Sequence, residues 1–107
     1  MRLRKIIQDV RNDVLVSVAR VWEIAIKSSL GKLSLPHPVV PVLQRQLINH
    51  ELVLLTLQLA HLATLEKLPH HHRDPFDRLL IAQCIEEGAA LITVDPQLRR
   101  YPVEIFD

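Results

Sequence analysis

RDPFDRLLIAQCIEEGAALITVD, residues 73–95, predicts a capped helix that leads into a buried strand. Asp74 has the character of an N-cap, a proline follows at the first helical position, and the helix is expected to run to Gly88. The apolar segment 89–94 then predicts a strand, and Asp95 with the proline after it repeats the helix-start signal. This order of helix and strand is typical of α/β sheets.

The rest of the chain continues this alternation. Its apolar patterns indicate helices over residues 1–11, 18–30, 39–49 and 57–68, and strands over residues 14–17, 51–57 and 103–106. We therefore expect an α/β fold with a mainly parallel sheet and helices on both faces. At 107 residues, the chain has the length of one domain. Ligands of such sheets bind at the carboxyl ends of the strands.

The composition is that of an ordinary globular protein, with 49% hydrophobic and 23% charged residues. A net charge of +1 provides no overall attraction to nucleic acid, so such a partner must be argued from a local site. The one cysteine, Cys84, excludes a disulfide within the chain, and both it and Trp22 are expected to pack in the core. Because no apolar run reaches the ~18 residues of a membrane span, we expect a cytoplasmic protein that does not enter a membrane.

Three acidic residues, Glu23, Asp77 and Asp95, follow strand ends or open helices in this arrangement. Each alone has a structural interpretation: Glu23 could pair with Lys27, Asp77 suits the first turn of its helix, and Asp95 could be an N-cap. Together at one sheet edge, three carboxylates would suit Mg²⁺ or Mn²⁺, because hard cations prefer oxygen ligands. Many α/β proteins carry acids at strand ends without binding a metal, so both interpretations stay open.

The basic residues beside these acids allow alternatives of their own. His70, His71 and His72 raise the possibility of zinc, but three consecutive side chains point poorly at one tetrahedral ion, and a solvated loop is the favoured interpretation. Arg73 and Arg78 could hold RNA phosphates, or they could pair with the neighbouring aspartates.

Two segments carry a resemblance to a known family. SVARVWEIAIKSSLGKLSLP, residues 17–36, and LPHHHRDPFDRLLIAQCIEEGAALITVD, residues 68–95, closely resemble PIN-domain proteins of the VapC toxin type. The resemblance implies a Mg²⁺- or Mn²⁺-dependent endoribonuclease whose acidic residues hold a metal that activates water for cleavage of RNA. It also implies an antitoxin protein as partner and a homodimer. By the same resemblance, Glu23, Asp77 and Asp95 match acids of the family's catalytic metal site, and Asp74 is a cap.

The chain departs from the family pattern in two places. PIN domains usually begin with a central strand that ends in an aspartate, within a DTH- or DTS-like stretch, and no such stretch precedes residue 14. We therefore expect an N-terminally truncated, single and incomplete PIN domain over residues 1–107. One interpretation is an endoribonuclease that the missing first aspartate would impair, unless the gene start has been placed too late and the real gene begins upstream. The other is an inactive remnant that binds RNA or an antitoxin. Arg20 stands where the family commonly has serine or threonine, and it could pair with Glu23 and compete with the metal.

Overall fold

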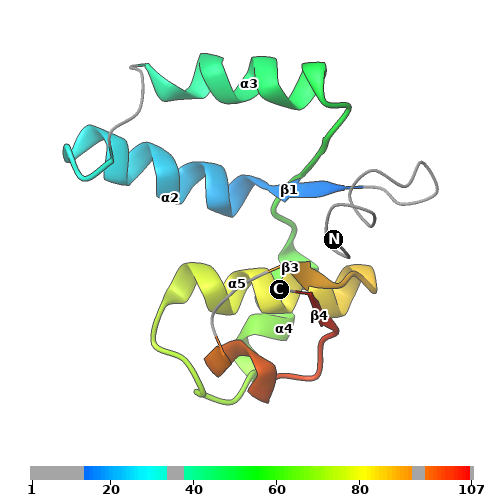
Figure 1. Cartoon of the computed structure of the whole chain (residues 1–107). Coiled ribbons are helices and arrows are strands. Elements are labelled where there is room, and N and C mark those ends of the chain that lie inside the picture. The colour runs from blue at the N-terminus through cyan, green and yellow to red at the C-terminus, as the bar shows by residue number, and fades with distance from the viewer. Residues whose placement is uncertain (1–13, 34–37, 93–95, 107) are drawn as a thin grey trace. The chain divides into compact units, whose positions relative to one another are not determined.

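The computed structural model describes residues 14–33, 38–92 and 96–106. The chain divides into two compact units, Met1–Thr56 and Leu57–Asp107, whose helices and strands are labelled in Figure 1. Each unit contains a pair of parallel strands and a pair of α-helices among its described residues. The helix expected over residues 1–11 lies outside the described residues and stays a prediction.

The first unit contains β1 (Leu15–Ser17), α2 (Val18–Ser29), α3 (Val39–Asn49) and β2 (Val53–Leu55). Ser17 ends β1 and caps α2, because its hydroxyl oxygen accepts a hydrogen bond from the backbone N–H of Ala19 at 3.1 Å. α2 ends just before Gly31, whose φ of 71° lies in the left-handed region that glycine adopts without strain. Both helix limits confirm the prediction from the sequence.

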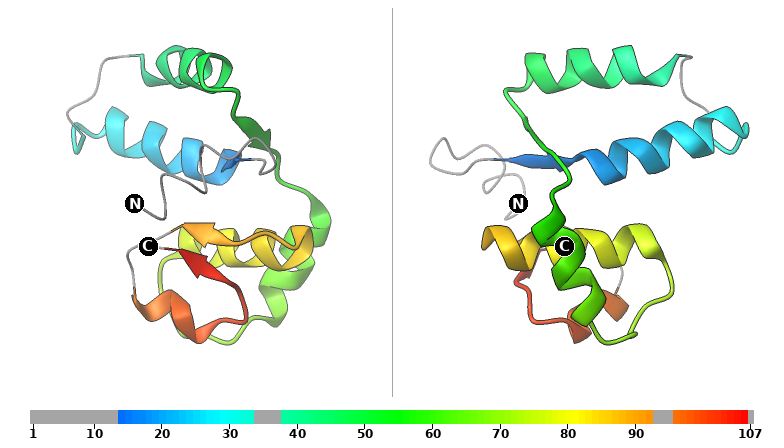
Figure 2. Two further views of the ribbon diagram at one scale, coloured as in Figure 1. Left: turned by 45° about the vertical axis from the view of Figure 1, so that its right-hand side comes forward. Right: turned by 180° about the vertical axis from the view of Figure 1, so that it is seen from behind.

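β1 and β2 run parallel, with Leu15 opposite Val53 and Ser17 opposite Leu55. The helices between them, α2 and α3, are in contact and run in opposite directions, as Figures 1 and 2 show. The described part of this unit buries mainly small or polar side chains: Ser17, Ala19, Glu23, Ser28 and Val39. The first unit therefore has no large apolar core among its described residues.

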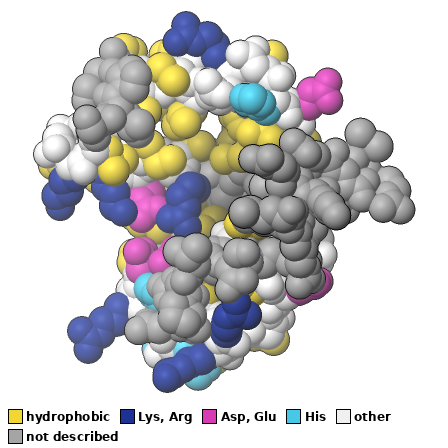
Figure 3. Space-filling view, in the orientation of Figure 1, with side chains coloured by type: hydrophobic (Ala, Val, Ile, Leu, Met, Phe, Trp, Pro, Cys, Tyr) yellow, Lys and Arg dark blue, Asp and Glu magenta, His cyan; other side chains and the backbone are white. Residues whose placement is uncertain are grey.

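The expectation that Trp22 packs in the core is wrong, since 57% of this residue is exposed. Ile26 and Leu30, which lie on the same stripe of α2, are also exposed, and hydrophobic side chains reach the surface of this unit in Figure 3. The helical spacing grouped these side chains correctly. Whether a stripe is buried depends on what packs against it, which spacing does not reveal.

The second unit contains α4 (Leu59–Lys67), α5 (Pro75–Glu87), β3 (Leu91–Ile92), the 3-10 helix η1 (Pro96–Arg100) and β4 (Ile105–Phe106). Asp74 caps α5, because its Oδ1 accepts hydrogen bonds from the N–H groups of Phe76 at 2.9 Å and Asp77 at 3.4 Å. Gly88 ends this helix with a φ of 62°. The cap and the glycine stop are both as predicted.

The core of the second unit is built around α5. Leu68, Ile81, Ala82, Leu98 and Tyr101 form its buried cluster. Five consecutive residues of α5, from Leu79 to Gln83, are buried, so this part of the helix is covered on all sides. α4 packs along α5, and the α5 start therefore stands on the best-packed described part of the chain.

The strand pairing confirms an α/β fold with parallel strands. In the second unit, Leu91 lies opposite Ile105 and Ile92 opposite Phe106. Within the described residues, the strands form two separate pairs and are shorter than predicted: β2 covers only part of 51–57. Whether helices cover both faces of a common sheet stays a prediction. No helix in the described ranges combines the length and apolar character needed to cross a membrane.

Candidate metal centre

Glu23 lies in the second turn of α2, shortly after β1 ends. Its side chain is only 6% exposed, and both carboxylate oxygens have basic partners from the same helix. Oε1 forms an ion pair with the guanidinium of Arg20, and Oε2 forms one with Nζ of Lys27 at 3.0 Å. The structure thus confirms the two pairings that the spacing predicted.

These ion pairs explain how α2 can bury an acidic side chain. A carboxylate removed from water is costly unless opposite charges or hydrogen bonds compensate it. Arg20 precedes Glu23 by three residues and Lys27 follows it by four, which are the spacings that place side chains on neighbouring turns. Basic side chains of the same helix therefore compensate the negative charge of the Glu23 carboxylate.

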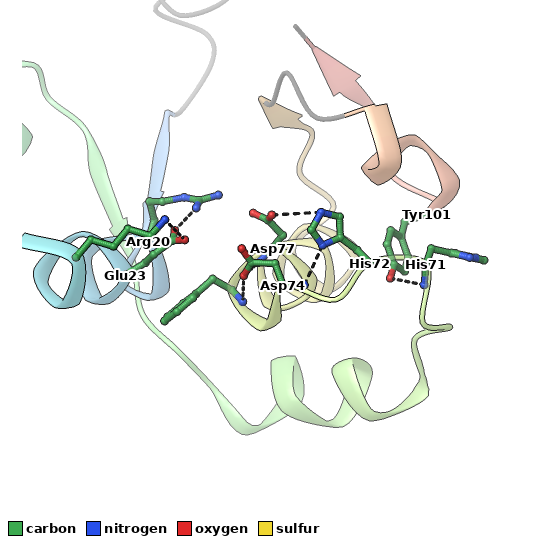
Figure 4. A network of polar contacts seen from close by, with 9 residues as sticks. Arg20, Glu23, His71, His72, Asp74, Asp77 and Tyr101 are labelled. Carbon is green, nitrogen blue, oxygen red and sulfur yellow. Dashed lines mark hydrogen bonds and ion pairs between the residues drawn. The ribbon is translucent and has the colours of Figure 1, made fainter. Parts of the chain in front are cut away.

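Asp77 lies in the first turn of α5, where the cap formed by Asp74 holds the backbone. Its carboxylate is 16% exposed, and Oδ2 lies 3.6 Å from Nε2 of His72. The other ring nitrogen of His72, Nδ1, accepts a hydrogen bond from the Asp74 N–H at 3.0 Å. Nε2 is the ring nitrogen that faces the Asp77 carboxylate, as Figure 4 shows.

Asp95, the third predicted ligand, lies outside the described residues, as do Thr93 and Val94. Glu23 belongs to the first unit and Asp77 to the second. The convergence of the three carboxylates on one metal thus stays a prediction. Among the described residues, no three histidine, cysteine or acidic side chains group closely enough to hold a metal ion.

The donor chemistry of the two described acids fits Mg²⁺ or Mn²⁺, since carboxylate oxygens are preferred ligands of hard cations. At Asp77 the carboxylate stands at a helix start beside a histidine. At Glu23 both oxygens already face positive charge, so a metal ion would have to displace at least one basic side chain. A metal ion at Glu23 would thus replace an arginine or a lysine contact, and one at Asp77 would approach beside His72.

The three histidines have separate surroundings. The backbone N–H of His71 donates to Oη of Tyr101 at 3.0 Å, and its ring meets the tyrosine ring edge-on, with centroids 5.1 Å apart. The hydroxyl of Tyr101 in turn donates to the carbonyl oxygen of Pro69 at 2.8 Å. Only His70 is largely exposed. The expected solvated loop is thus wrong for His71 and His72, which are tied to α5 and to the residues after η1.

The contacts of Arg78 differ from both partners that the sequence suggested, RNA phosphates and the neighbouring aspartates. Its Nη2 donates to the carbonyl oxygens of Leu65 at 3.5 Å and Leu68 at 3.1 Å, at the carboxyl end of α4. A cation at this position satisfies terminal carbonyls and complements the helix dipole. Arg78 thus ties α4 to α5, whereas Arg73 is exposed.

A buried polar cluster between α4 and α5 was missed by the sequence interpretation. His61 is 1% exposed, and its Nδ1 accepts a hydrogen bond from the backbone N–H of Gln58 at 3.0 Å. Nε2 lies 3.5 Å from a carboxylate oxygen of Glu87, and the amide of buried Gln83 lies 3.4 Å from Nδ1. The available signal was a polar residue with apolar neighbours on both sides, as His61 and Gln83 have in the sequence. These contacts hold the two helices together.

The comparisons with known proteins agree with this fold. A family model for the PIN domain matches residues 1–104, so the chain belongs to the PIN domain family. The chain is also similar to Ribonuclease VapC16 of Mycobacterium tuberculosis (strain ATCC 25618 / H37Rv), with 60% identity over 35 residues. These residues are 33% of this chain and 25% of the relative, so the match spans a quarter of that protein's length. No solved structure matches the chain at a significant level.

Proposed function

We propose that the chain is a metal-dependent endoribonuclease of the VapC toxin type, in which Glu23, Asp77 and Asp95 hold Mg²⁺ or Mn²⁺. Membership of the PIN family and the partial match to a ribonuclease support this proposal. The observation that carries it is the carboxylate of Asp77, which is held at the capped start of α5 with a histidine nitrogen facing it. Such an acid is positioned by the helix around which the core of the second unit is built.

In the proposed reaction, each of these residues has a defined task. A bound divalent cation would neutralise phosphodiester charge and orient the attacking water. Asp74 keeps the first turn of α5 in place and so positions Asp77. His72 presents Nε2 to the Asp77 carboxylate and restricts its orientation. Glu23 contributes a second carboxylate from α2.

The proposal includes the partners that the resemblance implies. The substrate is single-stranded or looped RNA, whose phosphates and bases are accessible to a protein. A cognate antitoxin protein would inhibit the enzyme, and the enzyme would act as a homodimer in the cytoplasm. A net charge of +1 means that the affinity for RNA has to come from the site itself.

A cleavage assay on a long RNA with Mn²⁺, and with EDTA in parallel, tests the proposal. We expect endonucleolytic fragments with Mn²⁺ and none with EDTA. Asp77→Asn and Asp95→Asn should each remove the cleavage, whereas Glu66→Gln, an equal charge change at an exposed residue of α4, should leave it intact. Equal cleavage by the wild type and both aspartate variants would refute the proposed site.

One observation favours a second candidate function, which is binding of RNA or an antitoxin without catalysis. Both oxygens of Glu23 are engaged by Arg20 and Lys27, which leaves this acid poorly prepared for a metal. A fluorescence titration of labelled RNA in EDTA distinguishes the two. Binding without any Mn²⁺-dependent cleavage would support the second candidate.

A further inference from the structure

We infer that the guanidinium of Arg20 occupies the position at Glu23 that a divalent cation would take, and that Arg20 thereby sets how tightly the chain binds Mg²⁺ or Mn²⁺. This inference rests on the proposed function, because it assumes that Glu23 is a metal ligand. It assigns to Arg20 the role of an internal competitor of the metal.

The first support is the contact itself. Arg20 and Glu23 form a charge-assisted hydrogen bond between Nη1 and Oε1 on neighbouring turns of α2, and Figure 4 shows the two side chains meeting. The Glu23 carboxylate is 6% exposed, so the pair is shielded on one side from water. Shielded pairs of this kind are stronger than the ion pairs of open helix surfaces.

The second support is the charge balance at Glu23. One carboxylate faces two cationic groups, because Lys27 holds Oε2 at 3.0 Å while Arg20 holds Oε1. A divalent cation that approached this carboxylate would meet repulsion from both groups. Binding of the metal consequently requires one of the two basic side chains to leave.

The third support concerns which of the two groups is in the way. α2 begins directly after the carboxyl end of β1, and open α/β sheets bind ligands at this end of their strands. Arg20 lies in the first turn of α2, on the side of Glu23 that is nearer to β1, whereas Lys27 lies in the last turn. The arginine thus covers the oxygen through which Glu23 would reach a ligand at the strand end.

A purely structural ion pair would make a different prediction from a competitor. If Arg20 only stabilised α2, its removal would lower the stability of the helix and leave the metal affinity unchanged or weaker. If Arg20 competes with the metal, its removal strengthens metal binding. After this removal Lys27 still compensates the charge of Glu23, so the fold should tolerate the change.

Titration of Mn²⁺ into the full chain, followed by the electron paramagnetic resonance signal of free Mn²⁺, measures this affinity without any need for activity. We expect Arg20→Ser to bind Mn²⁺ about tenfold more tightly than the wild type, which corresponds to one charge-assisted hydrogen bond that no longer has to be broken. Arg20→Lys, which keeps the charge, should stay close to the wild type. Thermal unfolding followed by circular dichroism verifies that each variant is folded.

Three further variants serve as controls. Lys27→Ser and Arg45→Ser each make the same charge change, the first on the other oxygen of Glu23 and the second at an exposed position of α3. Both should gain clearly less Mn²⁺ affinity than Arg20→Ser. In the double variant Arg20→Ser with Glu23→Gln, the gain should disappear because the carboxylate that Arg20 covers has been removed.

Several outcomes would overturn the inference. These are an Arg20→Ser affinity equal to the wild type, an equal gain in Lys27→Ser or Arg45→Ser, and a gain that survives Glu23→Gln. If Arg20→Ser gains nothing while Mn²⁺-dependent cleavage still requires Asp77, the inference fails and the proposed function stands. If neither the wild type nor Arg20→Ser binds Mn²⁺, both fail.

Discussion

The two units of the chain hold their candidate metal ligands in different ways. In the first unit, Glu23 lies buried between Arg20 and Lys27 on a helix that contributes no large apolar side chain to a core. In the second unit, Asp77 opens α5 beside His72, and the same helix forms the centre of the apolar core. The first carboxylate is already neutralised by cations, and the second is positioned by packing.

This difference shows that two acids of one proposed site need not contribute equally to metal binding. A carboxylate that must first release an ion pair loses part of its interaction with the metal to that exchange. A carboxylate on a capped helix start is instead held in position by its helix, and the contacts that Asp77 would exchange for a metal include the one with Nε2 of His72 at 3.6 Å. We therefore expect the second unit to carry most of the chemistry and most of the stability.

The largest effect is expected when the two carboxylates are removed separately. Asp77→Asn should reduce Mn²⁺-dependent RNA cleavage about a thousandfold, since loss of a metal ligand exceeds the 10- to 100-fold effect of outer-shell partners. Glu23→Gln should cost only about tenfold, because the cations beside Glu23 already limit its contribution. Cleavage rates at saturating Mn²⁺ measure both. Equal losses in the two variants would break the comparison between the acids.

The next effect concerns the stability contributed by one buried apolar side chain in each unit. Ile81→Ala should lower the free energy of unfolding by about 3 kcal/mol, because Ile81 is fully buried in the cluster around α5. Val39→Ala, at the buried apolar position of α3, should cost about 1.5 kcal/mol, since less apolar surface is removed. Urea denaturation measures both values. A larger loss for Val39→Ala would mean that the first unit is the better packed.

A smaller effect is expected in how the stability of the fold and the reactivity of the Cys84 thiol depend on pH. Burial raises the pKa of this thiol on α5 from 9.0 to about 11, so the folded chain holds the proton where the unfolded chain has lost it. The stability linked to this thiol is therefore fully present below pH 9 and is lost as the pH rises to 11. At pH 8, iodoacetamide should alkylate the native chain about a hundredfold more slowly than the unfolded chain.

A matched control moves the thiol to the first unit. In the double variant Cys84→Ala with Ser29→Cys, the cysteine stands at an exposed position of α2 and should react at the rate of an unfolded chain. Fast alkylation of native Cys84 would contradict the partial burial that raises the pKa of this thiol. The same variant should lack the loss of stability between pH 9 and 11 that the Cys84 thiol causes.

Much of the fold was predictable because its signals are local. The cap at Asp74, the helix ends before Gly31 and at Gly88, and the pairing of Glu23 with Arg20 and Lys27 each involve residues within about one turn of one another. For the candidate site, the sequence could name the three acidic residues but could not show that they lie close together. With Asp95 outside the described residues, and the other two acids in different units, their convergence stays a prediction.

Other features depended on contacts between distant parts of the chain. Tyr101 binds the carbonyl oxygen of Pro69, and Arg78 binds the carboxyl end of α4, so neither a solvated histidine loop nor a phosphate-binding arginine describes these residues. Trp22 lies exposed although its spacing suited a core. Backbone propensity and side-chain spacing act within a few residues and determine where helices begin, end and carry paired charges. Burial and long-range hydrogen bonds depend on which elements pack together, and only the folded chain determines that.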